Sequence, residues 1–268
     1  MLAKRLLTAA LLIPLVFLGT LKLSNDAFAI ALGFIVVLGA WEYSQLIQIK
    51  HPQLKIIYSV LVAIVGIGSG LCKASLMPIL VVSGVWWFFN ILWILLYPKY
   101  TCYWYSSWGV RLLNGFFVFV PMTVALVALQ LNNSGLVLLL LVLIWSADSG
   151  AFFVGKSIGK HKLSAKVSPG KTVEGAIGGI IATIGVMMIY VALQLEGASA
   201  GHYFQYAILA LLVAVASVVG DLFESLFKRI SNIKDSGNLL PGHGGIFDRV
   251  DSLTAAAPIF YLAYELLI

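Results

Sequence analysis

Apolar residues fill this chain in long runs that short polar segments separate. Each run is long enough for a helix to cross the hydrocarbon layer of a membrane, which is roughly 30 Å thick and takes about 20 residues. The pattern therefore predicts an all-α, polytopic helical membrane protein with about nine transmembrane helices. We place these helices at residues 6–23, 27–48, 56–72, 76–96, 111–130, 135–154, 174–195, 203–227 and 250–268.

Composition and charge agree with this fold class. The chain is 61% hydrophobic and 10% charged, with a mean hydropathy of +1.00, whereas soluble domains are about 25% charged. If the N-terminus lies in the cytoplasm, only Lys22 and Lys73 of the 17 Lys and Arg residues fall outside. Because this matches the positive-inside rule, the net charge of +6 requires no nucleic-acid partner.

The N-terminal part of the chain carries few chemical signals. Its first apolar run lacks a small-x-small cleavage motif, so we expect a retained span rather than a signal peptide. Cys72 and Cys102 lie in different segments, which indicates neither a zinc site nor a disulfide framework. We divide one continuous membrane domain into an N-terminal scaffold, residues 1–134, and a C-terminal region with two polar loops, residues 135–268, in which we expect the function to reside. Glu42 lies inside the second span, where a structural hydrogen bond and a catalytic role both remain open.

A first polar cluster occupies residues 217–251 and holds five of the eleven carboxylates: Asp221, Glu224, Asp235, Asp248 and Asp251. Helical spacing places four polar residues on one face: Asp221, Glu224, Ser225 and Lys228. The turn of residues 241–245, which contains His243, Gly244 and Gly245, is suited to present backbone N–H groups to an anion. Together these features predict a site for a metal-bound phosphate. For Arg229, Lys234 and Asp235 a solvated loop is an equally good explanation.

A second polar cluster runs from Trp145 to Gly175 and is expected on the same side of the membrane. Asp148 lies toward the end of the sixth span, and five lysines follow it. Ser168, Lys171, Thr172 and Glu174 lead into the next helix. Pro169 and Gly170 predict a turn just before that helix, a position suited to hold an anion.

Residues 150–157 match the Walker A expression G-x-x-x-x-G-K-[ST]. A P-loop follows a β-strand and opens a helix through a phosphate-binding turn. Here the intervening residues are apolar and continue a membrane span. We therefore predict helix at this position and no P-loop.

The two clusters resemble the phosphatidate cytidylyltransferases, the CDP-diacylglycerol synthases. The stretch Ser225 to Asp251 matches that family's signature at its fixed positions. The second cluster is similar to the family's acidic-Ser-x-Ala-aromatic and Ser-Pro-x-Lys-Thr-x-Glu-Gly stretches. Phe152 stands where the family often has Tyr, so this chain lacks a hydroxyl at that position.

The resemblance implies that CTP and phosphatidate react to give CDP-diacylglycerol and pyrophosphate, in phospholipid biosynthesis. It implies a bacterial inner membrane protein whose site faces the cytoplasm and meets membrane lipid; assembly as a homodimer is left open. It implies Mg²⁺ held by Asp221 and Asp248, and a second, monovalent cation such as K⁺ would suit the surplus of acid. The catalytic residues it implies are Asp221, Asp248, Lys171, Lys228 and Arg249. The substrate-binding residues it implies are Asp148, Ser168, Lys171, Thr172, Glu174, Glu224, Ser225, Lys228, Arg229, His243, Gly244, Gly245 and Asp251.

Two other classes of protein fit the residues. A CTP-dependent lipid kinase would use the same nucleotide and a lipid alcohol, and Asp148 or Glu224 would then serve as its base. An ion or phosphate transporter would also contain buried carboxylates. A transporter, however, needs a site near the membrane midplane with access to both sides, whereas the ionic residues here gather at one face.

The charge distribution generates a topology prediction. Reporter domains fused after Lys160 and after Lys234 are expected to be cytoplasmic, and a reporter after Ile268 is expected on the opposite side. Fusions that place Lys160 and Lys234 on opposite faces would refute both the topology and the single polar site.

Overall fold

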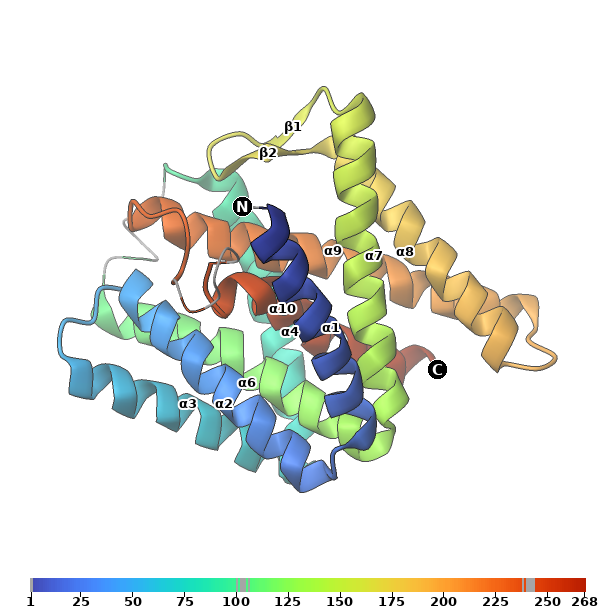
Figure 1. Cartoon of the computed structure of the whole chain (residues 1–268), viewed down its shortest axis with the longest axis horizontal. Coiled ribbons are helices and arrows are strands. Elements are labelled where there is room, and N and C mark those ends of the chain that lie inside the picture. The colour runs from blue at the N-terminus through green and yellow to red at the C-terminus, as the bar shows by residue number, and fades with distance from the viewer. Residues whose placement is uncertain (1, 100, 102–104, 106, 238, 240–243) are drawn as a thin grey trace.

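The computed structural model describes residues 2–99, 101, 105, 107–237, 239 and 244–268. For residues 2–9, 11–12 and 73–75 it describes the backbone alone. Helices form most of this part of the chain (Figure 1). Their bounds are α1 Leu2–Lys22, α2 Asn25–Leu46, α3 Pro52–Leu71, α4 Lys73–Leu96, α6 Trp108–Asn132, α7 Ser134–Ile158, α8 Val173–Gln194, α9 Ala200–Ile230 and α10 Phe247–Leu267. The all-α prediction is therefore confirmed.

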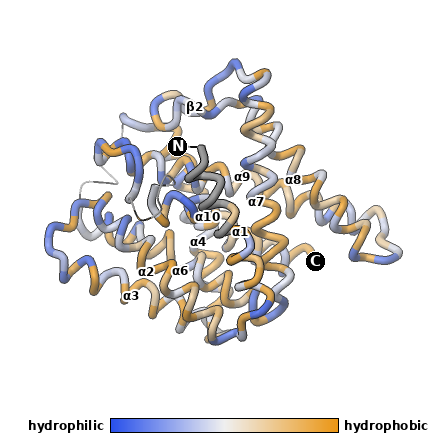
Figure 2. Tube along the Cα trace, viewed as in Figure 1, coloured by the Kyte–Doolittle hydropathy of each residue, from blue (hydrophilic) through white to orange (hydrophobic). Residues whose placement is uncertain are grey.

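Seven of these helices, α2, α3, α4 and α6 to α9, are long and apolar enough to cross a membrane. Hydrophilic positions gather at the loops, above all near β2 and after α9, while the helix bodies are mostly apolar (Figure 2). The first and last predicted spans correspond to α1 and α10. Their crossing of the membrane, and the side on which the N-terminus lies, stay predictions.

Local capping signals set several helix ends. The hydroxyls of Ser24, Ser107 and Ser199 each accept a backbone N–H in the first turn of α2, α6 and α9. Pro52 stands at the start of α3, where its missing N–H costs nothing. These residues explain why the helices begin within a few residues of the predicted bounds.

Helix α6 forms the centre of the fold, and it contacts α2, α3, α4, α7 and α10. A buried aromatic cluster joins α6 to the two helices that end at the polar site. The ring of Tyr43 in α2 lies 6.1 Å from that of Phe119 in α6, 5.4 Å from that of Phe227 in α9 and 6.0 Å from that of Phe247 in α10. Such pairs stabilise a core beyond their buried area. The cluster therefore packs α2 and α6 against α9 and α10, next to the polar residues Lys228 and Asp248.

The polar segment between α7 and α8 differs from the prediction. Strands β1 (Lys162–Ser164) and β2 (Ser168–Thr172) pair antiparallel, with Lys162 opposite Thr172 and Ser164 opposite Ser168. The turn lies between the strands, so the prediction of a turn at Pro169 and Gly170 is wrong. Proline is tolerated here because each strand of a two-stranded ribbon has an unpaired edge.

Helix α7 continues through the Walker A-like letters to Ile158, which confirms that residues 150–157 form no P-loop. The helix packs tightly against α8. A Cβ atom on Gly178 of α8 would lie 2.5 Å from the side chain of Val154, and one on Gly179 would lie 2.6 Å from the carbonyl oxygen of Ala147. Small residues that let helix backbones approach are typical of membrane helix pairs. This close packing fixes the base from which the β-hairpin projects.

Candidate active site

The C-terminal half of α9 carries its polar residues on one face, as predicted. Ser225 Oγ donates a hydrogen bond to Asp221 Oδ1 at 3.3 Å, and Lys228 Nζ donates one to Glu224 Oε2 at 2.5 Å. Both pairs are four residues apart, the spacing that brings side chains together on a helix. The Glu224 side chain is 1% exposed, so its charge depends on the neighbouring ammonium.

Lys228 also joins α9 to α10. Its Nζ lies 2.8 Å from Oδ1 of Asp248, in the first turn of α10. The other oxygen, Oδ2, accepts hydrogen bonds from the backbone N–H groups of Ser236 (3.0 Å) and Gly245 (2.8 Å). Hydrogen bonds to a carboxylate are stronger than neutral ones. Asp248 is therefore held in one orientation by donors of the chain itself.

The β-hairpin docks on α9 through two contacts. Lys171 Nζ in β2 lies 2.6 Å from Asp221 Oδ2, and both side chains are partly exposed, at 25% and 30%. Arg229 Nε donates a hydrogen bond to the backbone oxygen of Val167, in the hairpin turn, at 3.0 Å. These contacts bring the two polar clusters of the sequence together, as the predicted single site requires.

Other predicted residues surround the Lys171–Asp221 pair. Asp148 of α7 and Asp251 of α10 lie within electrostatic range of both Asp221 and Lys171, and Arg249 acts on Asp148. The structure thus brings acidic residues from three helices together with the hairpin lysine. Lys171 interacts with all three of these carboxylates, and Arg249 interacts with Asp148.

Thr172 and Glu174 of the second cluster stand at the junction between the hairpin and α8, whereas Ser168 stands at the other end of β2. The hydroxyl of Thr172 accepts a backbone N–H in the first turn of α8. Glu174 accepts hydrogen bonds from the backbone N–H groups of Lys160 (3.1 Å) and His161 (3.2 Å). Ser168 begins β2 and is half-buried. The observed contacts of Thr172 and Glu174 fix the junction, and a role of all three in substrate binding stays a prediction.

The predicted glycine turn lies partly outside the described residues, and His243 belongs to that part. Gly244 has φ of +81°, a conformation that favours glycine. The N–H of Gly245 points at Asp248, as described above. In this structure the anion that this part of the turn holds is therefore a carboxylate of the protein.

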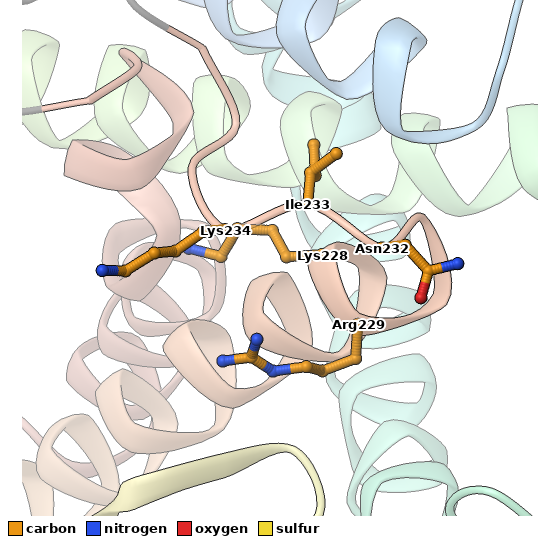
Figure 3. Close-up of a pocket in the computed structure, with 5 residues that line it drawn as sticks. All are labelled: Lys228, Arg229, Asn232, Ile233 and Lys234. Carbon is orange, nitrogen blue, oxygen red and sulfur yellow. The ribbon is translucent and has the colours of Figure 1, made fainter.

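A cavity of about 370 Å³ opens beside the end of α9 (Figure 3). Its volume lies in the range of small-molecule sites, about 300 to 1,000 Å³. The lining residues are Lys228, Arg229, Asn232, Ile233 and Lys234. Three of these five are cationic, and carboxylates of the chain bind one of them, Lys228, so Arg229 and Lys234 make the cavity suited to an anionic ligand such as a phosphate group.

The sequence indicated no partner for Glu42. In the structure its side chain lies against the residues that flank the glycine turn. Its Oε2 accepts hydrogen bonds from Ser236 Oγ (3.0 Å) and from the backbone N–H of Phe247 (2.8 Å). These donors lie more than 190 residues away in the chain. The only signal in the sequence was a charge inside an apolar run.

The chain is similar to one family model and to proteins of several bacteria. The family model described as the cytidylyltransferase family matches residues 3–267. A phosphatidate cytidylyltransferase of Pseudomonas aeruginosa is 41% identical over 264 residues, which cover 97% of this chain and 96% of that protein. The enzyme of the same name from Haemophilus influenzae is 36% identical over 284 residues, 98% and 99% of the two chains. That of Bacillus subtilis is 47% identical over 125 residues, 47% of this chain and 45% of that protein.

The buried ion group of Glu224, Lys228 and Asp248 generates a stability prediction. Lys228→Met leaves a buried carboxylate without its counter-charge, which should lower the free energy of unfolding by about 3 to 5 kcal/mol. We expect a large fall in the thermal unfolding temperature of the detergent-purified protein. Lys234→Met, a nearby exposed lysine, is the matched control and should change little. Combining Glu224→Gln with Lys228→Met should recover part of the loss; no recovery would contradict the pairing.

Proposed function

The chain belongs to the cytidylyltransferase family, and on that premise we propose that it transfers the cytidylyl group of CTP to phosphatidate. The products are CDP-diacylglycerol and pyrophosphate. The observation that carries the proposal is the meeting of the hairpin with α9 at Lys171 and Asp221, 2.6 Å apart. This contact gathers cations and carboxylates at the ends of membrane helices, where a soluble nucleotide and a lipid phosphate are able to meet.

The reaction requires positioning and charge neutralisation. A phosphate oxygen of phosphatidate attacks the α-phosphorus of CTP, the bond from that phosphorus to the bridging oxygen breaks, and pyrophosphate leaves. Because the attacking group is already anionic, no strong base is needed. This suits the geometry, since Glu224 and Asp248 are both engaged by Lys228. Lys171, Lys228 and Arg249 would bind phosphate oxygens and offset the charge that develops in the transition state.

Divalent metal fits the oxygen donors of this site. No group of three or more His, Cys, Asp or Glu side chains is arranged to hold a metal ion within the described part of the chain. Mg²⁺, however, takes only one or two protein carboxylates and completes its coordination with water and substrate phosphates. Asp221 is partly exposed and has Asp148 and Asp251 nearby, so added positive charge would relieve their repulsion. We assign Mg²⁺ to Asp221 and Asp248; when bound it would orient the triphosphate and neutralise its charge. A monovalent cation such as K⁺ is proposed nearby.

The site is proposed to face the cytoplasm of a bacterial inner membrane. The bacterial relatives and the excess of Lys and Arg on one predicted side support this placement. CTP would reach the site from the water, and phosphatidate would keep its acyl chains in the bilayer.

The three candidate functions transfer different groups. A cytidylyltransferase transfers the α-phosphorus of CTP, a lipid kinase transfers the γ-phosphorus, and a transporter transfers neither. Purified protein is given CTP labelled at either the α- or the γ-phosphorus, with phosphatidate or a lipid alcohol as acceptor. We expect the α-label to enter the lipid only with phosphatidate, and the γ-label to leave as pyrophosphate. Transfer of the γ-label to the alcohol would indicate a kinase, and no transfer would refute both enzymes.

The metal assignment generates a prediction for the two aspartates. Asp221→Asn and Asp248→Asn keep the shape but remove one charge each. We expect turnover to fall by at least about 10²-fold, on the order of 3 kcal/mol of transition-state stabilisation, with normal membrane insertion. Asp235→Asn, an exposed loop residue, is the control and should matter less. Near-normal turnover of both variants at saturating Mg²⁺ would refute the assignment.

A further inference from the structure

Glu42 brings a charge from α2 to the start of α10. Its side chain is 1% exposed, and its Oε2 accepts the N–H of Phe247, the first residue of α10. The residue before it, Ile246, makes no side-chain cap. The first N–H groups of a helix need acceptors and favour negative charge. Glu42 therefore supplies the cap of α10 from a distant helix.

The described residues on either side of the loop before α10 pack closely around this carboxylate. A Cβ atom on Gly237 would clash with Glu42 Oε1, and one on Gly245 would clash with Oε2. Any larger residue at either position would have to displace the loop or the carboxylate. Close approach to Glu42 thus accounts for both glycines.

The same loop holds Asp248. Ser236 donates its hydroxyl to Glu42 and its backbone N–H to Asp248 Oδ2. On the other side, Gly245 donates to Asp248 while Phe247, two residues later, donates to Glu42. The backbone on both sides of the glycine turn is therefore fixed between one buried carboxylate and one carboxylate of the site.

We propose that Glu42 is a positioning residue of the reaction, one that orients Asp248 by fixing the loop that carries its donors. This inference rests on the proposed function. The residue acts as a hydrogen-bond acceptor for two donors and does not touch the substrates. Loss of that acceptor would release Ser236 and Phe247 together, and a small misplacement of a reacting geometry costs up to about 10²-fold in rate.

The test compares substitutions that keep or remove the acceptor. Glu42→Ala should lower kcat/KM for CTP by about 10-fold or more and raise the Mg²⁺ concentration for half-maximal rate. Glu42→Gln, whose amide oxygen can accept the same two donors, should stay within about 3-fold of wild type. Ser44→Ala is the matched control, since Ser44 is buried on the same helix and donates only to the backbone oxygen of Trp41. Thermal unfolding of each variant is measured alongside.

A double substitution tests whether Glu42 acts through Asp248. In the Asp248→Asn background, adding Glu42→Ala should lower kcat/KM for CTP by less than about 3-fold. The effects of two residues that act as one unit do not add. Fully additive losses would overturn the proposal. If Glu42→Ala does not fold, Ser236→Ala carries the test by removing one donor, and wild-type kinetics for it would overturn the proposal.

The outcomes also separate this inference from the proposed function. A wild-type protein without cytidylyl transfer to phosphatidate would refute the function itself. An active wild type whose Glu42→Ala variant behaves like Ser44→Ala would refute the positioning role alone.

Discussion

The site depends on one ammonium group that two helices share. Lys228 lies between Glu224 and Asp248, and the three side chains are 14%, 1% and 9% exposed. Charges this dry are costly unless each has a partner. Moving α10 away from α9 would therefore leave at least one charge unpaired. The ion group thus fixes the mutual position of the two helices, and the aromatic cluster around Tyr43 supports them from below.

The Lys171–Asp221 pair works under a different constraint. Both side chains are about a quarter exposed, so water screens this pair more than it screens the ion group around Lys228. The Lys171–Asp221 pair is therefore easier to open than the group around Lys228. Under the proposed function, a polyanionic substrate with its metal would exchange partners with Lys171 and Asp221, and the α9–α10 frame would stay in place. In this proposal the buried ion group around Lys228 keeps the helices in place, and the more exposed pair of Lys171 and Asp221 is the one that opens.

The helices were predictable because the apolar runs are long and their ends carry caps, and the shared face of Asp221 and Ser225 follows from helical spacing. The β-hairpin was not, since strands of three and five residues with Pro169 and Gly170 in one of them show no alternation. The role of Glu42 was not predictable either, because its hydrogen-bond donors, Ser236 and Phe247, lie 194 and 205 residues further along the chain. Local patterns predict local structure, and only the tertiary packing shows which charges meet.

The glycines near the signature motif show how this packing changes an interpretation. A glycine turn beside cations and carboxylates predicts a site for a substrate phosphate. In the structure the N–H of Gly245 is used by Asp248, and its missing side chain makes room for Glu42. Hydrogen bonds to these carboxylates are charge-assisted and thus stronger than those to neutral acceptors. This end of the turn is therefore built to hold a carboxylate of the protein itself, and the cavity beside it is lined by cationic side chains, Lys228, Arg229 and Lys234.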